Sequence, residues 1–349
     1  MVDLKTMTAT ELEQYLVDQG FPAYRGRQIY NWMYARGIFD LESMSDLPSS
    51  LRSSLAKIAT ISSLTERKSQ ESDDGTIKIL YQMSSGKAIE TVLIPDFDAQ
   101  RQAKRITVCV SSQVGCAMDC SFCATGKMGF QQNLSSGEIY DQVFLANQLA
   151  LERYARSLTN IVFMGMGEPL LNFQAVCDSV EKIASKNGLG MAPRRITIST
   201  VGLAGKIKEL ADQEFKTNLA VSLHAPTDKK RSSIMPINRK EKTDLKALRE
   251  SIEYYSENTK RPVTYEYCLF KNFNDTIEDA IHLSNIVQWA PSKVNLIMYN
   301  PVEGVRFERS NEETVHKFVR ELVKRRVRVT VRKSRGKDID AACGQLSLR

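Results

Sequence analysis

Three cysteines lie close together in the chain, at Cys116, Cys120 and Cys123, with the spacing C-x3-C-x2-C. Three thiolates at this spacing can bind three irons of a 4Fe–4S cube and leave the fourth iron open to a substrate. A structural zinc site is the alternative, but it needs four ligands, usually in two close pairs. Neither His nor Cys occurs in the forty residues after Cys123. The spacing therefore favours a redox or radical centre.

Two further cysteines stand out by their place in the chain. Cys109 lies at the end of a predicted strand just before the cysteine run, and Cys343 lies in a terminal loop beside a glycine. A cysteine outside a disulfide is most often a small buried residue, and it becomes a nucleophile only where its thiolate is favoured. The residues alone leave both interpretations open for this pair. Cys177 and Cys268 are assigned to packing.

The elements that must position these thiols alternate between strands and helices. Apolar runs predict strands near 105–110, 159–164, 194–199, 217–222, 263–269, 293–298 and 327–332. Apolar periodicity predicts helices near 135–154, 172–186, 203–213, 242–259, 276–289 and 311–326. The alternation predicts parallel strands with right-handed crossovers, and the first six fit an α/β fold, an incomplete (β/α)6 barrel. Polar residues that follow these strands should meet at the face where ligands bind.

The chain before this alternation follows other patterns. Residues 1–60 predict helices, with a capping box at Thr8 and Glu11 and a helix start at Pro48. Segments 77–81 and 89–94 alternate as strands between glycine turns. The predicted organisation is a small N-terminal helical domain at 1–60, a short β-rich connector at 61–100, the core barrel at 101–332 and a C-terminal loop at 333–349.

The positive charge of this 349-residue chain is concentrated near its C-terminal end. The net charge is +7, and residues 317–349 alone hold eleven basic and three acidic residues. Such a patch attracts phosphates, although a solvated helix end gives the same pattern. No apolar run is long enough to span a bilayer, and the first residues lack a signal peptide, so a cytoplasmic protein without membrane contact is expected. Seven cysteines, an odd number, argue against a disulfide framework.

Four stretches carry a resemblance to known enzymes. They are residues 110–116 (VSSQVGC), 165–172 (GMGEPLLN), 222–226 (SLHAP) and 338–346 (DIDAACGQL). The cysteine run, with Phe122 before its last cysteine, resembles the cluster loop of the radical S-adenosylmethionine (SAM) superfamily. Together the four stretches resemble its RlmN/Cfr family of RNA adenine methyltransferases, over nearly the whole chain. The resemblance implies a barrel core, a 4Fe–4S cluster and SAM bound to the open iron.

The resemblance also implies an activity. It is methylation of carbon 2 of an adenosine in 23S rRNA and of an adenosine in the tRNA anticodon loop. Two SAM molecules are used per turnover, one as methyl donor and one as source of a 5′-deoxyadenosyl radical. The route passes through a methylcysteine and a covalent enzyme–RNA adduct.

Roles for single residues follow from the same resemblance. Cys116, Cys120 and Cys123 are the cluster ligands. Cys343 carries the methyl group, Cys109 resolves the adduct through a transient disulfide with Cys343, and Glu90 accepts a proton. The implied SAM-binding residues are Gly167, Glu168, Ser199, Ser222, Leu223, His224 and Asn300. From sequence alone, an ordinary cap or loop hydrogen bond is the default for the polar ones.

Partners and alternatives complete the prediction. The implied partners are the two RNAs and an external electron donor such as flavodoxin, and a monomer is expected. One alternative is a Cfr-type enzyme that methylates carbon 8 of adenine in rRNA. A second is a zinc-stabilised RNA-binding protein without catalysis. A third is a radical SAM enzyme that acts on a substrate other than RNA.

Overall fold

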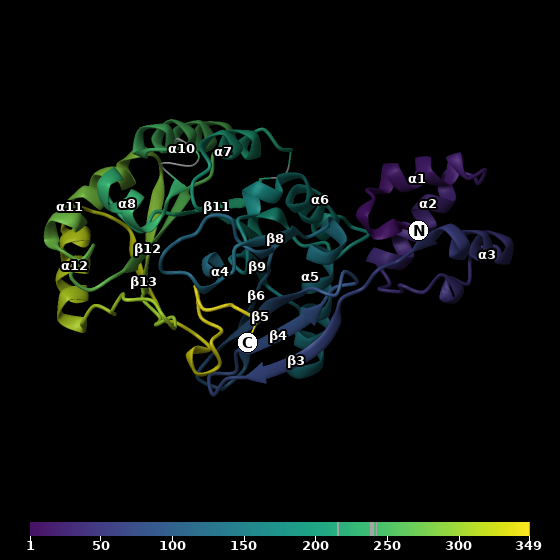
Figure 1. Cartoon of the computed structure of the whole chain (residues 1–349), viewed down its shortest axis with the longest axis horizontal. Coiled ribbons are helices and arrows are strands. Elements are labelled where there is room, and N and C mark those ends of the chain that lie inside the picture. The colour runs from purple at the N-terminus through teal and green to yellow at the C-terminus, as the bar shows by residue number, and fades with distance from the viewer. Residues whose placement is uncertain (215, 238–240, 242, 349) are drawn as a thin grey trace.

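One large mixed sheet runs through the computed structural model, which describes residues 1–214, 216–237, 241 and 243–348 (Figure 1). Within that part of the chain the sheet has ten strands. In spatial order they are β14 (Val329–Arg332), β13 (Ser292–Met298), β12 (Val263–Leu269), β11 (Asn218–Ser222), β10 (Ile196–Thr200), β9 (Asn160–Phe163), β6 (Ala103–Cys109), β5 (Ala88–Phe97), β4 (Ile77–Gln82) and β3 (Thr65–Glu71). Neighbours from β14 to β6 pair in parallel, and those from β6 to β3 are antiparallel.

The predicted α/β fold class is confirmed, with two differences in the sheet. The connector strands β4 and β5 extend the same sheet instead of standing apart from it. In addition, β3 was not predicted at all. Six of its seven residues are exposed, so this edge strand carries no apolar alternation that a pattern search could find.

Helices follow the parallel strands as the alternation predicts, and most of them lie on the outer side of the curved sheet (Figure 1). They are α5 (Ser136–Tyr154), α6 (Phe173–Ala184), α7 (Ala204–Ala211), α8 (Asp228–Ile234), α10 (Leu245–Thr259), α11 (Ile277–Ile286) and α12 (Glu312–Lys324). Capping boxes begin α5 and α11. The short α8 was not predicted. Positions 242 and 349, the first residue of one expected helix and the last of the expected C-terminal loop, lie outside the described residues.

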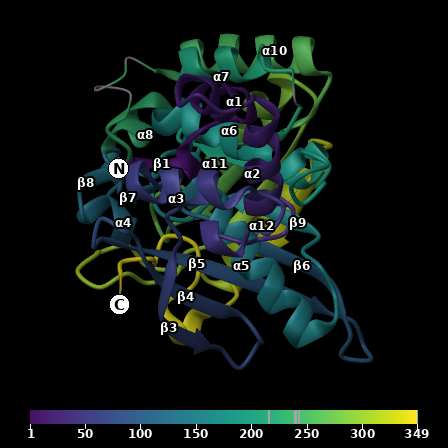
Figure 2. The same cartoon turned by 90° about the vertical axis from the view of Figure 1, so that its right-hand side faces the viewer.

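The N-terminal helices α1 (Ala9–Asp18), α2 (Tyr24–Tyr34) and α3 (Ser49–Ile58) gather at one end of the molecule (Figures 1 and 2). The capping box predicted at Thr8 and Glu11 is present. A buried ion pair joins Lys5 to Asp141 of α5, and the Tyr34 hydroxyl donates to the Lys5 carbonyl at 2.9 Å. These contacts fix the N-terminal helices against the core. No helix among the described residues is long and apolar enough to cross a membrane.

Candidate active site

Most of the predicted site residues line one cavity of about 210 Å³. Its lining includes Cys109, Cys116, Cys120, Cys123, Gly167, Glu168, Ser222, His224, Asn300 and Cys343. Ser199 lines a second hollow of about 110 Å³ that shares several of these walls. Leu223 and Glu90 are fully buried and line neither. The carboxyl ends of the parallel strands therefore converge as expected for this fold.

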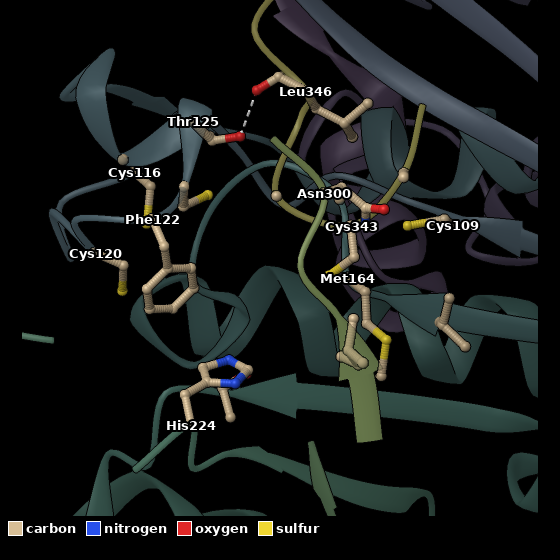
Figure 3. Close-up of a pocket in the computed structure, with 18 of the residues that line it drawn as sticks. Cys109, Cys116, Cys120, Phe122, Thr125, Met164, His224, Asn300, Cys343 and Leu346 are labelled. Carbon is tan, nitrogen blue, oxygen red and sulfur yellow. Dashed lines mark hydrogen bonds between the residues drawn. The ribbon is translucent and has the colours of Figure 1, made fainter. Parts of the chain in front are cut away.

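The cysteine loop is closed by a short two-stranded sheet, β7 (Gln113–Gly115) with β8 (Phe130–Asn133). Gly115 has a φ of +71°, and a Cβ there would lie 1.8 Å from the Gly129 carbonyl oxygen. Only glycine can occupy this position without a backbone shift. The C-terminal segment crosses the loop, because the Thr125 hydroxyl donates to the Leu346 carbonyl at 2.7 Å (Figure 3). The loop that bears the three thiols is thus held from two sides.

The three thiols of the loop all line the same cavity, as the ligands of a cluster with one open iron must. A 4Fe–4S cube binds each thiolate at a separate iron, so its ligands lie farther apart than those of a tetrahedral zinc. Burial raises the pKa of the Cys120 thiol well above its usual value, so a bound metal is needed to hold it as a thiolate. The residues present therefore fit an iron–sulfur cube.

The loop after β9 approaches the cavity through two glycines. Gly167 has a φ of +99°, and a Cβ there would lie 2.6 Å from the Gln113 side chain. Next to it, the buried Glu168 carboxylate accepts the Val201 N–H at 2.9 Å and the Leu170 N–H at 3.1 Å. Burial raises the pKa of Glu168 to about 7, against the effect of these hydrogen bonds. Glu168 therefore joins the ends of β9 and β10 as well as lining the cavity.

Two polar side chains on the cavity wall have unusual surroundings. Both amide atoms of the buried Asn300 lack a hydrogen-bond partner among the described residues. Such an unpaired buried amide is costly, and a polar ligand would satisfy it. His224 has a φ of +54°, its Nδ1 accepts the Cys268 N–H at 3.0 Å, and burial lowers its pKa to about 3. Its neutral ring lies edge-on to Phe122 at 4.9 Å, so it serves packing and hydrogen bonding more than proton transfer (Figure 3).

Cys109 and Cys343 lie at the other side of the cavity (Figure 3). Cys343 is exposed to the cavity yet surrounded by protein, and this burial raises the pKa of its thiol to about 11. Burial also raises the pKa of Cys109 to about 12. No disulfide joins any of the seven cysteines, all of which are described. The expected Cys109–Cys343 disulfide is thus not supported here, and a transient bond stays a proposal.

Sequence patterns assigned Arg332 to a surface patch, but it lines the cavity beside these two thiols. Its guanidinium lies 3.4 Å from the Glu266 carboxylate and lowers the pKa of both thiols against the effect of burial. One sequence signal could have found it. Arg332 is the last residue of β14, and a strand end was the rule for the other site residues.

Glu90 lies in β5 and lines neither cavity. Its carboxylate accepts two N–H groups of the C-terminal segment, Ser347 at 2.8 Å and Leu348 at 3.0 Å. The segment that carries Cys343 therefore also reaches Glu90. Sequence patterns placed the two residues in separate regions of the chain.

Comparison with known proteins identifies the family. Residues 110–284 match the model of the radical SAM superfamily, and residues 2–61 match the N-terminal domain of ribosomal RNA large subunit methyltransferases. A protein of Salinibacter ruber, a probable dual-specificity RNA methyltransferase RlmN, is 54% identical over 99% of this chain and 94% of its own. The dual-specificity RNA methyltransferase RlmN of Geobacter sulfurreducens is 42% identical over 99% and 92%.

A solved structure agrees with this result. A radical SAM methyltransferase from Sphaerobacter thermophilus superposes with a TM-score of 0.91 at 43% identity, over 100% of both chains. Membership of the superfamily implies a 4Fe–4S cluster and SAM, which the thiols and the unpaired amide of Asn300 fit. The chain therefore belongs to the RlmN family of dual-specificity RNA methyltransferases.

Proposed function

We propose that this chain methylates carbon 2 of an adenosine in 23S rRNA and of an adenosine in the tRNA anticodon loop. One observation carries the proposal. Cys109 and Cys343 line the same cavity as the three cysteines of the cluster loop. A cluster alone generates a radical, whereas two additional thiols within the same cavity can carry a methyl group and then release it.

The cavity residues divide between cofactor and substrate. Cys116, Cys120 and Cys123 would hold the cluster, and the SAM-binding set named above would hold SAM, with Asn300 and Gly167 offering the clearest polar and backbone contacts. When bound, the cluster and two SAM molecules per turnover supply a carbon-centred radical and the methyl group. The neutral His224 ring packs against Phe122 of the cluster loop, and this contact would help to exclude water from the cavity.

Cys343 acts as the methyl carrier in this proposal. A thiolate is needed to accept a methyl group, and a thiol whose pKa is raised to about 11 is ionised only to a small extent at neutral pH. Arg332 is the cation at the cavity wall that opposes this effect. Methyl acceptance should therefore become faster as the pH rises toward 11, about tenfold for each unit well below that value.

Release of the product involves the other two residues. Once the methylene carbon on Cys343 is joined to carbon 2 of adenine, the radical adduct must give up one electron, which the bound cluster would take up, and Glu90 accepts the proton from carbon 2. The Cys109 thiolate then attacks the Cys343 sulfur, so that an S–S bond forms and the S–C bond breaks. The released carbon keeps the electron pair and takes a proton, which gives the methyl product. The disulfide must then be reduced by two electrons from an external thiol before the next turnover.

RNA binding is proposed for the basic C-terminal region and the N-terminal helices. Lys333 and Arg335 lie at the cavity, where they can pair with phosphates, although Arg335 also contacts Asp96 at 3.0 Å. An adenine must leave its stack to reach a buried site. We further propose that the chain acts as a cytoplasmic monomer and receives electrons for its cluster from a donor such as flavodoxin.

The test uses three cysteine variants of the reconstituted chain. Cys343→Ala should abolish product and leave the iron and sulfide content unchanged, whereas Cys109→Ala should trap a covalent protein–RNA species. Cys177→Ala, a buried cysteine that lines neither cavity, is the matched control. Mass spectrometry of the modified RNA locates the methyl group. Normal product yield from Cys109→Ala would overturn the resolving role, and methyl at carbon 8 would replace the carbon-2 assignment with the Cfr-type alternative.

A further inference from the structure

A buried lysine lies beside the proposed proton acceptor. Lys78 of β4 is 4% exposed and Glu90 of β5 is fully buried, and Lys78 Nζ lies 3.3 Å from Glu90 Oε1. The antiparallel register pairs Leu80 with Glu90 and Lys78 with Val92, so Lys78 is the diagonal neighbour of Glu90. Diagonal neighbours on one sheet face are within reach of long side chains. The alternating pattern of the sequence did not predict a partner for either residue.

The second oxygen of the Glu90 carboxylate is held by a different part of the chain. Glu90 Oε2 accepts the N–H groups of Ser347 and Leu348, at 2.8 Å and 3.0 Å. These residues follow Cys343 by only a few positions. The carboxylate is therefore held between a lysine of the sheet and the backbone of the C-terminal segment.

The backbone of Glu90 is fixed separately from its side chain. Its carbonyl accepts the Ser111 hydroxyl at 2.6 Å, and its N–H points to the Met166 sulfur at 3.4 Å. The Ser111 hydroxyl also accepts the Met166 N–H at 2.9 Å. Ser111 therefore ties the backbone of Glu90 to the segment that follows β9. Loss of the Lys78 charge would thus leave the strand in place and change only the surroundings of the carboxylate.

The pairing of Lys78 with Glu90 is incomplete in one respect. Glu90 Oε1 makes no hydrogen bond among the described residues, although the ammonium of Lys78 lies within ion-pair distance. The Lys78 ammonium therefore sets the position of Oε1, while the two N–H groups of the C-terminal segment set the position of Oε2. A proton acceptor must be held within reach of the proton that it takes, so this orientation matters for the reaction.

We propose that Lys78 is a positioning residue for Glu90 and holds its carboxylate in the orientation in which Oε1 accepts the proton from carbon 2 of adenine. The N–H groups of Ser347 and Leu348 hold Oε2 and so couple the orientation of Glu90 to the segment that carries Cys343. This inference rests on the proposed role of Glu90. Stability alone gives little reason for the pair, because an apolar pair of similar volume is often at least as stable in a protein interior.

The test compares Lys78→Met with Lys182→Met in the full, cluster-loaded enzyme. Lys182 is also a buried lysine, but it donates to the Ser136 hydroxyl and lines neither cavity, so it is the matched control. Single turnovers are followed with RNA that carries hydrogen or deuterium at carbon 2 of the target adenine. For Lys78→Met we expect normal methylation of Cys343, product formation slowed about tenfold or more, and a larger deuterium isotope effect than in wild type. Lys182→Met should match wild type in all three.

Two outcomes separate this inference from the role of Glu90 itself. If Glu90→Gln loses product while Lys78→Met keeps both the wild-type rate and the wild-type isotope effect, the role of Lys78 is wrong and that of Glu90 stands. If Glu90→Gln also forms product at the wild-type rate, the role of Glu90 is wrong. Should Lys78→Met fail to fold, Lys78→Gln, which keeps a polar side chain of similar length, is judged by the same two readouts. Lys78→Arg, which keeps the charge, should recover part of the rate.

Discussion

Among the described residues, two lysine–carboxylate pairs are buried on both sides, and they differ in how many of their polar atoms have hydrogen-bond partners. At the N-terminal junction, Lys5 contacts Asp141 Oδ1, Asp141 Oδ2 accepts the Leu64 N–H at 3.2 Å, and the Lys5 ammonium lies 3.7 Å from the centre of the Phe39 ring. Both carboxylate oxygens and the ammonium have partners there. At the site, Lys78 and Glu90 are 3.3 Å apart, and one Glu90 oxygen makes no hydrogen bond among the described residues.

The difference fits a structural role for the first pair and the proposed role in proton transfer for the second. A fully satisfied pair has one stable arrangement and holds two elements together, here the N-terminal helices and α5. A pair with an open oxygen can gain a proton or a ligand without breaking another bond. In addition, the other Glu90 oxygen is held by the backbone of the segment that carries Cys343 and not by the sheet.

The largest expected effect comes from Glu90→Gln. The amide keeps the size of the side chain but cannot accept the proton, so product formation should fall about a hundred- to ten-thousand-fold. The protein should still fold, since its backbone at this position is anchored by Ser111. Mass spectrometry of the RNA measures the loss of product, and thermal unfolding measures whether the variant still folds. A large loss of stability with normal activity per folded molecule would place this pair in the same class as Lys5 and Asp141.

Asp141→Asn should show the opposite pattern. It leaves the Lys5 ammonium buried without its anion, which typically costs about 3–5 kcal/mol of the free energy of unfolding. Activity per folded molecule should stay near that of wild type, because Asp141 does not line the cavity. Urea unfolding measures the loss. Glu71→Gln removes a half-exposed pair with Arg153 and should cost no more than about 1 kcal/mol, so it is the control.

Removing both charges of each pair sharpens the comparison. Lys5→Met combined with Asp141→Asn should be more stable than Asp141→Asn alone, since no unpaired buried charge remains. Lys78→Met combined with Glu90→Gln should stay as inactive as Glu90→Gln alone. A double-mutant cycle on the free energy of unfolding tests the first pair, and a cycle on the rate of product formation tests the second. Recovery of activity in the second double variant would contradict proton transfer by Glu90.

The smallest expected effect concerns the C-terminal N–H groups. Ser347→Pro removes one donor to Glu90 Oε2, while Ser347→Ala removes the hydroxyl and keeps the donor. We expect a loss of rate of about tenfold for the proline variant and none for the alanine variant, because one hydrogen bond to a charged group contributes about 1.5 kcal/mol at the low end of its range and the Leu348 N–H still donates to Glu90 Oε2. Equal rates for the two variants would show that the C-terminal segment does not hold Glu90.

Much of the fold was predictable because its signals are local. The capping boxes before α5 and α11 and the apolar runs of β9 to β13 depend on residues a few positions apart. The exposed edge strand β3 has no such signal, and the short α8 gave none that was recognised. Arg332 was counted in the basic C-terminal patch because it lies in a run of charges, whereas its partner, Glu266, lies 66 residues away in the sequence. A pattern search cannot see a contact of that range.

The sequence by itself determined the spacing of three thiols, the order of strands and helices, and which residue types follow the strands. Local rules set these, because backbone propensity and apolar periodicity act over short distances. Only the tertiary structure decided which buried charges meet. Glu90 contacts Ser347 across 257 residues of sequence, and Lys78 reaches it only through the register of β4 and β5. Burial then gives those contacts their energy, since a charge removed from water needs a partner wherever the fold places it.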